Sequence, residues 1–270
     1  MCRNNIEINK VHISSYLLWP VYCVFIILGS LSSCTQSANQ KSVNPIKAQP
    51  LDSAIVASAD IKRAIAPYKK ELEAKMNTVI GFAANEFNNN CGESRESTLG
   101  NFVADLLLVQ TKKVFDNSLD LAVINHHGGL RTPIRKGNIT VQNIYELMPF
   151  DNEMWVLEIE GNLVQQLFDN AAQRKSNCIA GATYTIASNK KATDIIINNK
   201  PFDENKTYRV SISDYLAGGG GGHSFFKNIS PVYDTDYKCR DMIIDYIKAN
   251  SADKKDTLVP KIDGRVKMSL

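Results

Sequence analysis

The sequence predicts a single α/β domain, of the α+β kind, over residues 58–270. Segments with helical spacing and segments with strand-like runs of apolar residues alternate along this one continuous stretch. The 270-residue chain is 44% hydrophobic and 22% charged, which is ordinary for a globular protein. No internal repeat divides the stretch, so we expect one folded body.

The helices are predicted from apolar residues that recur every three or four positions. The segments with this spacing are residues 60–76, 97–115, 162–172 and 236–249. A shorter helix is expected to begin at Thr140, whose hydroxyl can cap it, and to run through Leu147. Pro67 is expected to kink the first helix or to mark its true start, because proline removes a hydrogen bond inside a helix.

The strands are predicted from short apolar runs bounded by polar or glycine-rich segments. These runs are residues 78–83, 119–124, 153–159, 183–187, 194–197 and 208–212. Residues 213–224, which are rich in glycine, are expected to form a loop after the last strand.

The first 34 residues have the pattern of a bacterial lipoprotein signal. Arg3 and Lys10 lie in a polar leading region, and residues 16–28 form an apolar stretch of 13 residues, too short to span a bilayer comfortably. Small residues then precede Cys34, as in a lipobox, which predicts that Cys34 is lipidated and becomes the new N-terminus. The alternative is an ordinary signal peptide with a chance cysteine.

The composition after the signal indicates a tethered protein of the cell envelope. Residues 35–57 are polar and predict a flexible tether. We therefore expect a periplasm-facing, lipid-anchored protein, of a Gram-negative bacterium, that contacts the membrane through its lipid only. The net charge of +3, without a Lys/Arg block, argues against a nucleic-acid polymer as partner.

Three cysteines remain in the predicted mature domain, at positions 91, 178 and 239. An odd number allows one disulfide plus one free thiol in an oxidising compartment. No CxxC or other zinc-binding spacing occurs.

Residues 125–131, with the sequence NHHGGLR, and residues 148–152, with the sequence MPFDN, carry the strongest signal for a ligand site. Two adjacent glycines let the backbone approach a ligand closely, because they have no Cβ. Arg131 presents a rigid charged fork suited to phosphate or carboxylate. Phe150 adds a flat ring in an expected loop, and together these features predict a nucleotide pocket.

The order and spacing of these motifs resemble the C-terminal domain of the 5′-nucleotidase family. The matching blocks, over about 200 residues, are RESTLGN at 95–101 with Asp105, GGLR at 128–131, GNIT at 137–140, PFDN at 149–152, Gly161, and DYLA at 214–217 before the glycines. The resemblance implies a layered α/β sandwich with a mixed sheet. It also implies that the domain recognises a nucleotide or nucleoside.

The resemblance implies a role for each matching position. Phe150 and Tyr215 would clamp the nucleobase, and stacking on an aromatic ring contributes on the order of 1–3 kcal/mol per base. Arg131 would reach the ribose-phosphate side, and Asn152 would hydrogen-bond the base edge. Either Asn125 or His126 would take the place of a base-contacting asparagine. The other implied binding positions are Arg95, Gly128, Gly129, Gly219 and Gly220.

Each of these roles has a structural alternative. Phe150 and Tyr215 could pack in the core, and Arg131 could form a surface salt bridge. Arg95, flanked by Glu93 and Glu96, could do the same. Asn101 and Asp105 could hold a loop by hydrogen bonds.

The glycine loop departs from the family pattern. Family members usually carry an aspartate there, which accepts hydrogen bonds from the ribose hydroxyls, and Gly221 falls at that position in this chain. Asp214 or His223 could substitute for it. The run from Gly218 to Gly222 is costly to order, so we expect the loop to become fixed when ligand binds.

A second departure concerns catalysis. In the family, hydrolysis belongs to an N-terminal metallophosphatase domain with two metal ions, and none of its motifs occurs in this chain. We therefore expect the substrate-recognition half of a 5′-nucleotidase, with no catalytic residue or metal of its own. Divalent metals are expected on a separately encoded metallophosphatase partner.

Two other functions remain open from the sequence. The chain could be a stand-alone periplasmic lipoprotein that binds nucleosides. It could also be a metalloenzyme, with His126, His127, His223 and Asp214 around a zinc or transition-metal ion.

Overall fold

A computed structural model of the chain describes residues 52, 55–92, 95–174, 177–251, 253 and 256–269. The chain divides into two units, Met1–Ala57 and Ser58–Leu270, and the fold described here is that of the second unit. The predicted signal, the lipobox cysteine Cys34 and almost all of the predicted tether lie outside the described residues.

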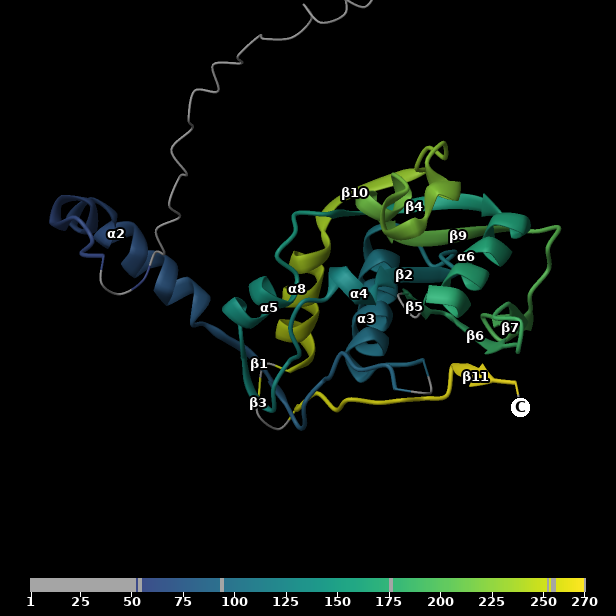
Figure 1. The fold of residues 1–270 in the computed structure, drawn as a ribbon, viewed down its shortest axis with the longest axis horizontal. Helices are drawn as coiled ribbons and strands as arrows, with labels where there is room; N and C mark the ends of the chain where they lie inside the picture. The colour runs from purple at the N-terminus through teal and green to yellow at the C-terminus, as the bar shows by residue number, and fades with distance from the viewer. Residues whose placement is uncertain are drawn as a thin grey trace, which may run out of the picture. The chain divides into compact units, whose positions relative to one another are not determined.

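The centre of the fold is a mixed five-stranded sheet with strand order β10-β4-β9-β2-β5 (Figure 1). These strands are β2 (Leu121–Asn125), β4 (Glu153–Glu160), β5 (Asn177–Ala180), β9 (Thr207–Ser213) and β10 (Tyr233–Lys238). The pair β2–β9 is parallel, whereas β4–β9, β2–β5 and β10–β4 are antiparallel. The α/β class and the mixed sheet are therefore confirmed.

Two smaller sheets complete the strand layout. One has the order β11-β6-β7-β8 and the other pairs β1 with β3. The strands are β1 (Val79–Ala83), β3 (Gly137–Thr140), β6 (Ala182–Ile186), β7 (Ala192–Ile197), β8 (Lys200–Pro201) and β11 (Val266–Met268). Between β2 and β3 lies the short helix α4 (His126–Gly129).

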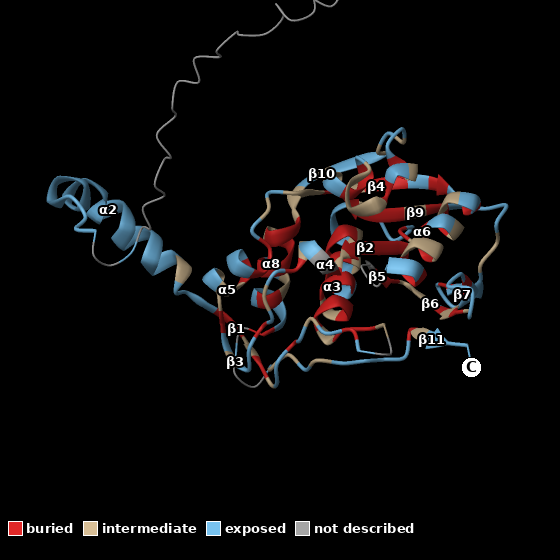
Figure 2. Ribbon diagram, in the orientation of Figure 1, coloured by how far each residue is buried: buried red, intermediate tan, exposed pale blue. Residues whose placement is uncertain are grey.

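Helices cover the central sheet. Successive residues of its strands point to opposite faces, so a single strand contributes side chains to two different buried clusters. Along β2, Ala122 and Ile124 join one buried cluster, with apolar residues of α3 (Thr98–Val114), α5 (Val141–Leu147) and α8 (Cys239–Asn250). Leu121 and Val123 join the other cluster, with residues of α6 (Gly161–Arg174), β6 and β7. Figure 2 shows buried residues concentrated on β2, β9 and α3.

The first predicted helix is present as α2 (Ala59–Met76), with Pro67 inside it. Of the two alternatives predicted for Pro67, a kink or the true helix start, the second is wrong, because the helix already begins at Ala59. No residue of α2 is buried, and the apolar positions Ile61, Ile65, Tyr68 and Leu72 are between 50% and 75% exposed. The helix is accordingly drawn in the exposed colour over most of its length in Figure 2.

The structure corrects two other expectations. The helix predicted at 236–249 begins only at Cys239, because the preceding residues Tyr233–Lys238 pair with β4 as strand β10. The loop expected at 213–224 contains a short helix, α7 (Asp214–Ala217), and two 3₁₀ turns, Gly220–Gly222 and Ser224–Phe226.

Within the described residues, no helix is long and apolar enough to cross a membrane.

Candidate functional site

A cavity of about 830 Å³ opens at one edge of the central sheet. The parallel strands β2 and β9 both end there, at Asn125 and Ser213. Because Met154 pairs with Ser213 in the antiparallel β4–β9 ladder, the loop before β4 reaches the same edge. The cavity is lined by Ile124, Asn125, Gly128, Gly129, Arg131, residues 148–152, Ser213, Tyr215, Leu216 and Gly221.

Phe150 and Arg131 meet on one side of this cavity. The Cζ atom of Arg131 lies 5.2 Å from the centroid of the Phe150 ring, which is cation–π distance. The backbone N–H of Arg131 donates to the carbonyl of Leu147, at 2.8 Å, so the arginine is tied to the end of α5. Phe150 is half-buried and packs against the buried cluster that contains residues of α3, α5 and α8, yet it also lines the cavity.

Tyr215 is held against the glycine loop. Its hydroxyl accepts a hydrogen bond from the backbone N–H of Gly221, at 3.2 Å. A Cβ at Gly220 would lie 2.5 Å from Cζ of the Tyr215 ring, so a glycine is needed there for the ring to take this position. Tyr215 is 54% exposed, which excludes core packing as the reason for its presence.

The positions of Asn125 and Gly221 are linked. Gly221 has a left-handed φ of +57°, and a Cβ there would lie 2.9 Å from Nδ2 of Asn125. An aspartate at 221 would therefore displace the Asn125 amide, which occupies this part of the cavity wall. The Oδ1 atom of Asn125 is buried without a partner among the described residues, which leaves an acceptor for a ligand or for water.

Asp214 joins the two ring-bearing segments. Its Oδ1 accepts one hydrogen bond from Nδ2 of Asn152, at 2.8 Å, and another from the backbone N–H of Tyr215, at 2.6 Å. Asn152 lines the cavity, whereas Asp214 is not among the lining residues. Asp214 thus connects the Phe150 loop to Tyr215 and is not placed to replace the missing aspartate.

Several residues predicted for the site lie elsewhere. His126 is fully buried, and its ring nitrogens lie 3.4 and 3.6 Å from Sγ of Cys91, so Asn125 is the one of the pair that faces the cavity. Gly219 and Gly220 do not line the cavity: Gly220 lies against the Tyr215 ring, and Gly219 lies beside Ser224 and Lys227.

Arg95 is likewise absent from the cavity wall. The Nη1 atom of Arg95 is buried without a hydrogen-bond partner among the described residues. Arg95 follows two undescribed residues and adopts a left-handed φ of 63°.

His223 supports the glycine loop from the inside. It is fully buried, its Nδ1–H donates to the carbonyl of Gly220 at 3.1 Å, and its ring stacks on Phe226 at a centroid distance of 5.9 Å. Burial lowers the pKa of His223, so the ring is neutral at pH 7. His223 is therefore a loop support and does not face a ligand.

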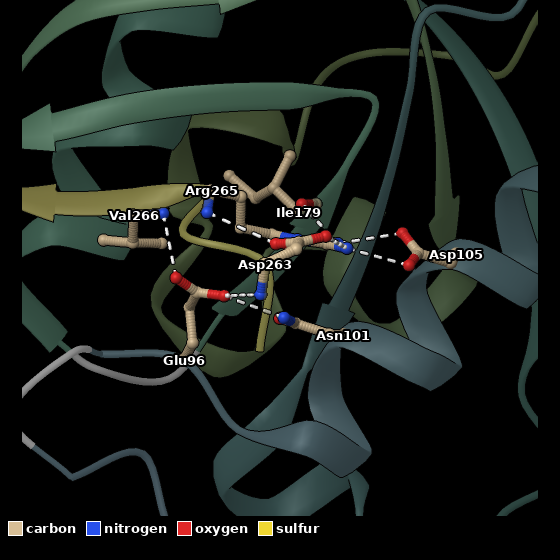
Figure 3. Close-up of polar contacts among 7 residues, drawn as sticks. All are labelled: Glu96, Asn101, Asp105, Ile179, Asp263, Arg265 and Val266. Carbon is tan, nitrogen blue, oxygen red and sulfur yellow. Dashed lines mark hydrogen bonds and ion pairs between the residues drawn. The ribbon is translucent and has the colours of Figure 1, made fainter. Parts of the chain in front are cut away.

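Asn101 and Asp105 hold the C-terminal segment on α3, as Figure 3 shows. Arg265, which is 8% exposed, donates to both carboxylate oxygens of Asp105 at 2.8 Å and also pairs with Asp263. The buried carboxylate of Glu96 accepts from Nδ2 of Asn101, at 2.8 Å, and from the backbone of Asp263 and Val266. These groups are structural.

The remaining titratable groups give no metal-binding cluster. Among the described residues, no group of three or more His, Cys, Asp or Glu side chains is arranged to hold a metal ion. Cys91, Cys178 and Cys239 are buried thiols, and burial raises the pKa of Cys178 and of Cys239 to about 12.

The fold and the cavity define a class of protein: an α/β domain with a cavity at one sheet edge that is lined by two aromatic rings, an arginine and an asparagine. Comparison with known proteins makes this class specific. The sequence profile of the 5′-nucleotidase C-terminal domain matches residues 79–228. The chain therefore belongs to the 5′-nucleotidase C-terminal domain family.

Similar proteins agree with this assignment. The chain is 26% identical to the trifunctional nucleotide phosphoesterase YfkN of Bacillus subtilis, over 81% of this chain and 16% of that protein. It is also 26% identical to the NAD 5′-nucleotidase of Haemophilus influenzae, over 73% and 37%. The crystal structure of a 5′-nucleotidase precursor from Thermus thermophilus superposes with a TM-score of 0.65 at 25% identity, covering 77% of this chain and 42% of that one. The chain thus spans less than half the length of each of these three proteins.

Proposed function

We propose that this chain binds the nucleoside part of a nucleotide in the cavity at the sheet edge. The base would stack between Phe150 and Tyr215, with the phosphate toward Arg131. The observation that carries this proposal is that both rings and the arginine line one cavity of about 830 Å³. Relatives whose names state nucleotide substrates support the same ligand class.

We further propose that the chain is the recognition half of a 5′-nucleotidase and acts in nucleotide breakdown. The activities named for the relatives belong to proteins of which the chain matches 42% or less. A metallophosphatase on a separate chain, carrying divalent metals, would then supply the hydrolysis. The residues of this chain would bind and orient the nucleotide for that partner.

Titration calorimetry with AMP and adenosine tests the binding proposal. The protein used would be the chain from Thr35 onward, which keeps every described element. Phe150→Ala and Tyr215→Ala are each expected to weaken adenosine binding by about 1–3 kcal/mol, because each removes one stacking surface. Tyr68→Ala, on the 75% exposed Tyr68 of α2, is the matched control and should bind like the parent.

The outcome that contradicts the proposal is equally direct. If the parent chain binds neither ligand, or both ring variants bind as it does, the cavity is not a nucleoside site. Arg131→Ala distinguishes recognition of the phosphate from recognition of the nucleoside, because it should weaken AMP binding more than adenosine binding.

Phosphate release tests the division of labour between two chains. The purified chain alone is expected to bind AMP without releasing phosphate, and release should begin when a metal-loaded metallophosphatase partner is added. Release by the chain alone at ordinary enzymatic rates, on the order of 1 s⁻¹ or faster, would show that no partner is needed.

We propose that the protein is anchored to the membrane through lipid on Cys34 and faces the periplasm. The apolar residues 16–28 and the small residues before Cys34 support this. Cells fed labelled palmitate should label the parent protein but not Cys34→Ala. Equal labelling of the two proteins would refute the anchor.

A further inference from the structure

Arg240 lies in the first turn of α8, behind the loop that carries Phe150. We propose that Arg240 is a positioning residue, which fixes the Phe150 loop so that the ring can stack on a base. This inference rests on the proposed nucleoside binding. Arg240 itself does not line the cavity.

The guanidinium of Arg240 holds three parts of the loop. Its Nη1 donates to the carbonyl of Phe150, at 3.1 Å, and to that of Met148, at a longer 3.4 Å. Its Nη2 forms an ion pair with the carboxylate of Asp151. The Cζ atom also lies 4.2 Å from the centroid of the Tyr145 ring, so the group is covered on one face by α5.

The guanidinium of Arg240 is buried, whereas the carboxylate of its partner Asp151 is exposed. Arg240 is 6% exposed, and its Nε is buried without a partner among the described residues, so the two terminal nitrogens make its polar contacts. The planar fork brings two separate nitrogens to the two carbonyls and the carboxylate, whereas the donors of an ammonium group all lie on one nitrogen. A lysine at position 240 would therefore keep the positive charge but lose some of the contacts with the Phe150 loop.

The same helix end ties the loop once more, because the backbone N–H of Cys239 donates to the carbonyl of Asn152, at 2.9 Å. The segment from Met148 to Asn152 is thus fastened to α8 at both of its ends, with Phe150 between them. The Phe150 ring itself lies against the exposed Arg131. Arg240 sets the backbone under the ring, while Arg131 meets the ring itself.

A purely structural role predicts a different result. If Arg240 only stabilised the fold, its replacement would lower the folded fraction and weaken ligand binding regardless of what stands at position 150. If it acts through Phe150, its effect must depend on that ring. A double-mutant cycle measures this dependence.

The experiment measures AMP affinity in the chain from Thr35 onward and in four variants: Arg240→Lys, Arg240→Met, Phe150→Leu and the pair Arg240→Lys with Phe150→Leu. Arg240→Lys should weaken AMP binding about tenfold when Phe150 is present, which is part of the effect of losing a stacking ring. The same change should weaken binding less than about twofold in the Phe150→Leu background. Circular dichroism would confirm that each variant is folded.

Lys238→Met is the matched control. Lys238 lies on the other side of the same carboxylate, with Nζ 3.3 Å from Oδ2 of Asp151, but no contact joins it to the Phe150 carbonyl among the described residues. Removing this cation should leave AMP affinity within about twofold of the parent.

The results separate the two proposals. A parent chain that binds AMP, together with Arg240→Lys and Arg240→Met variants of unchanged affinity, overturns the role of Arg240 alone. An equal loss with Phe150 present and in the Phe150→Leu background overturns it as well, because the effect then does not pass through the ring. A parent chain without AMP affinity overturns the proposed function, and the role of Arg240 with it. Should Arg240→Met fail to fold, the lysine variant decides.

Discussion

At the scale of single residues, the site depends on glycines that make room for neighbours. Gly220 leaves space for the Tyr215 ring, and Gly221 leaves space for the amide of Asn125. The unusual glycine run is therefore explained at two positions by close contacts in the cavity wall. Loop flexibility is not needed to account for either position.

Gly220→Ala should move the Tyr215 ring, because the new Cβ would lie 2.5 Å from it. We expect AMP affinity to fall by about 1 kcal/mol or more, up to the loss expected on removing the ring. Calorimetry measures the AMP affinity of Gly220→Ala, Tyr215→Ala and the double variant. The alanine at 220 should add little once the ring is gone, and equal losses in both backgrounds would contradict this interpretation.

His223 gives the domain a pH dependence. Its folded pKa is lowered from the ordinary value of 6.5, chiefly by burial, so the unfolded chain takes up a proton first as the pH falls. Stability is thus at its full value above about pH 6.5 and declines as the pH falls from there toward the lower folded pKa.

His223→Asn should flatten this decline, because the Asn amide can keep the hydrogen bond to Gly220 without titrating. Urea unfolding at about pH 7.5 and about pH 5, on either side of the ordinary histidine pKa, measures the difference. If parent and variant lose the same free energy of unfolding between these two values, His223 does not titrate as its burial requires.

The residue scale is also where prediction from sequence reached its limit. Phe150, Tyr215, Arg131 and Asn152 were predicted and all line the cavity, but Asn125 and His126 stayed alternatives. A shift of one residue at a strand end reverses the side to which a side chain points, so the register must come from the fold.

Arg240 carried no signal in the sequence. It is an ordinary basic residue on a helix, and its contacts are to loop residues about 90 positions earlier in the chain. Only the folded structure brings these groups together.

At the scale of elements, the long helices were predictable and the short strands were not. Helices α3 and α6 carry several apolar residues at helical spacing, and the structure ends them within two residues of the predicted bounds. Strands β8 and β11 are only two and three residues long and exist because of their partners β7 and β6. Such short segments carry too little pattern of their own.

The element β11 is held at its start by Arg265, and this contact can be tested. Arg265→Met would remove the hydrogen bonds to Asp105 and Asp263 and leave both carboxylates without this cation (Figure 3). We expect a loss of about 2–4 kcal/mol in the free energy of unfolding, since charged hydrogen bonds at a buried arginine disappear.

Lys267→Met is the control for Arg265, because Lys267 is an exposed neighbour in β11. It should change the free energy of unfolding by less than about 0.5 kcal/mol. Urea titration measures both. Equal, small effects of the two substitutions would show that the Arg265 network does not hold the strand.

At the scale of the whole molecule, the fold brings distant segments to one sheet edge. The cavity draws residues from the end of β2, the loop before β4 and the turn after β9, which span positions 124–221. This range lies within the residues 79–228 that match the family profile. The candidate ligand site is thus contained in the family domain, whereas α2 and the segments before it lie outside.

A crystal structure of the chain with AMP tests the central proposal most directly. We predict that the base lies between the rings of Phe150 and Tyr215, that the phosphate points toward Arg131, and that Asn125 donates to or accepts from the ligand. A base bound elsewhere, or a nucleotide in the cavity that touches neither ring, would contradict the assignment of this domain to nucleoside recognition.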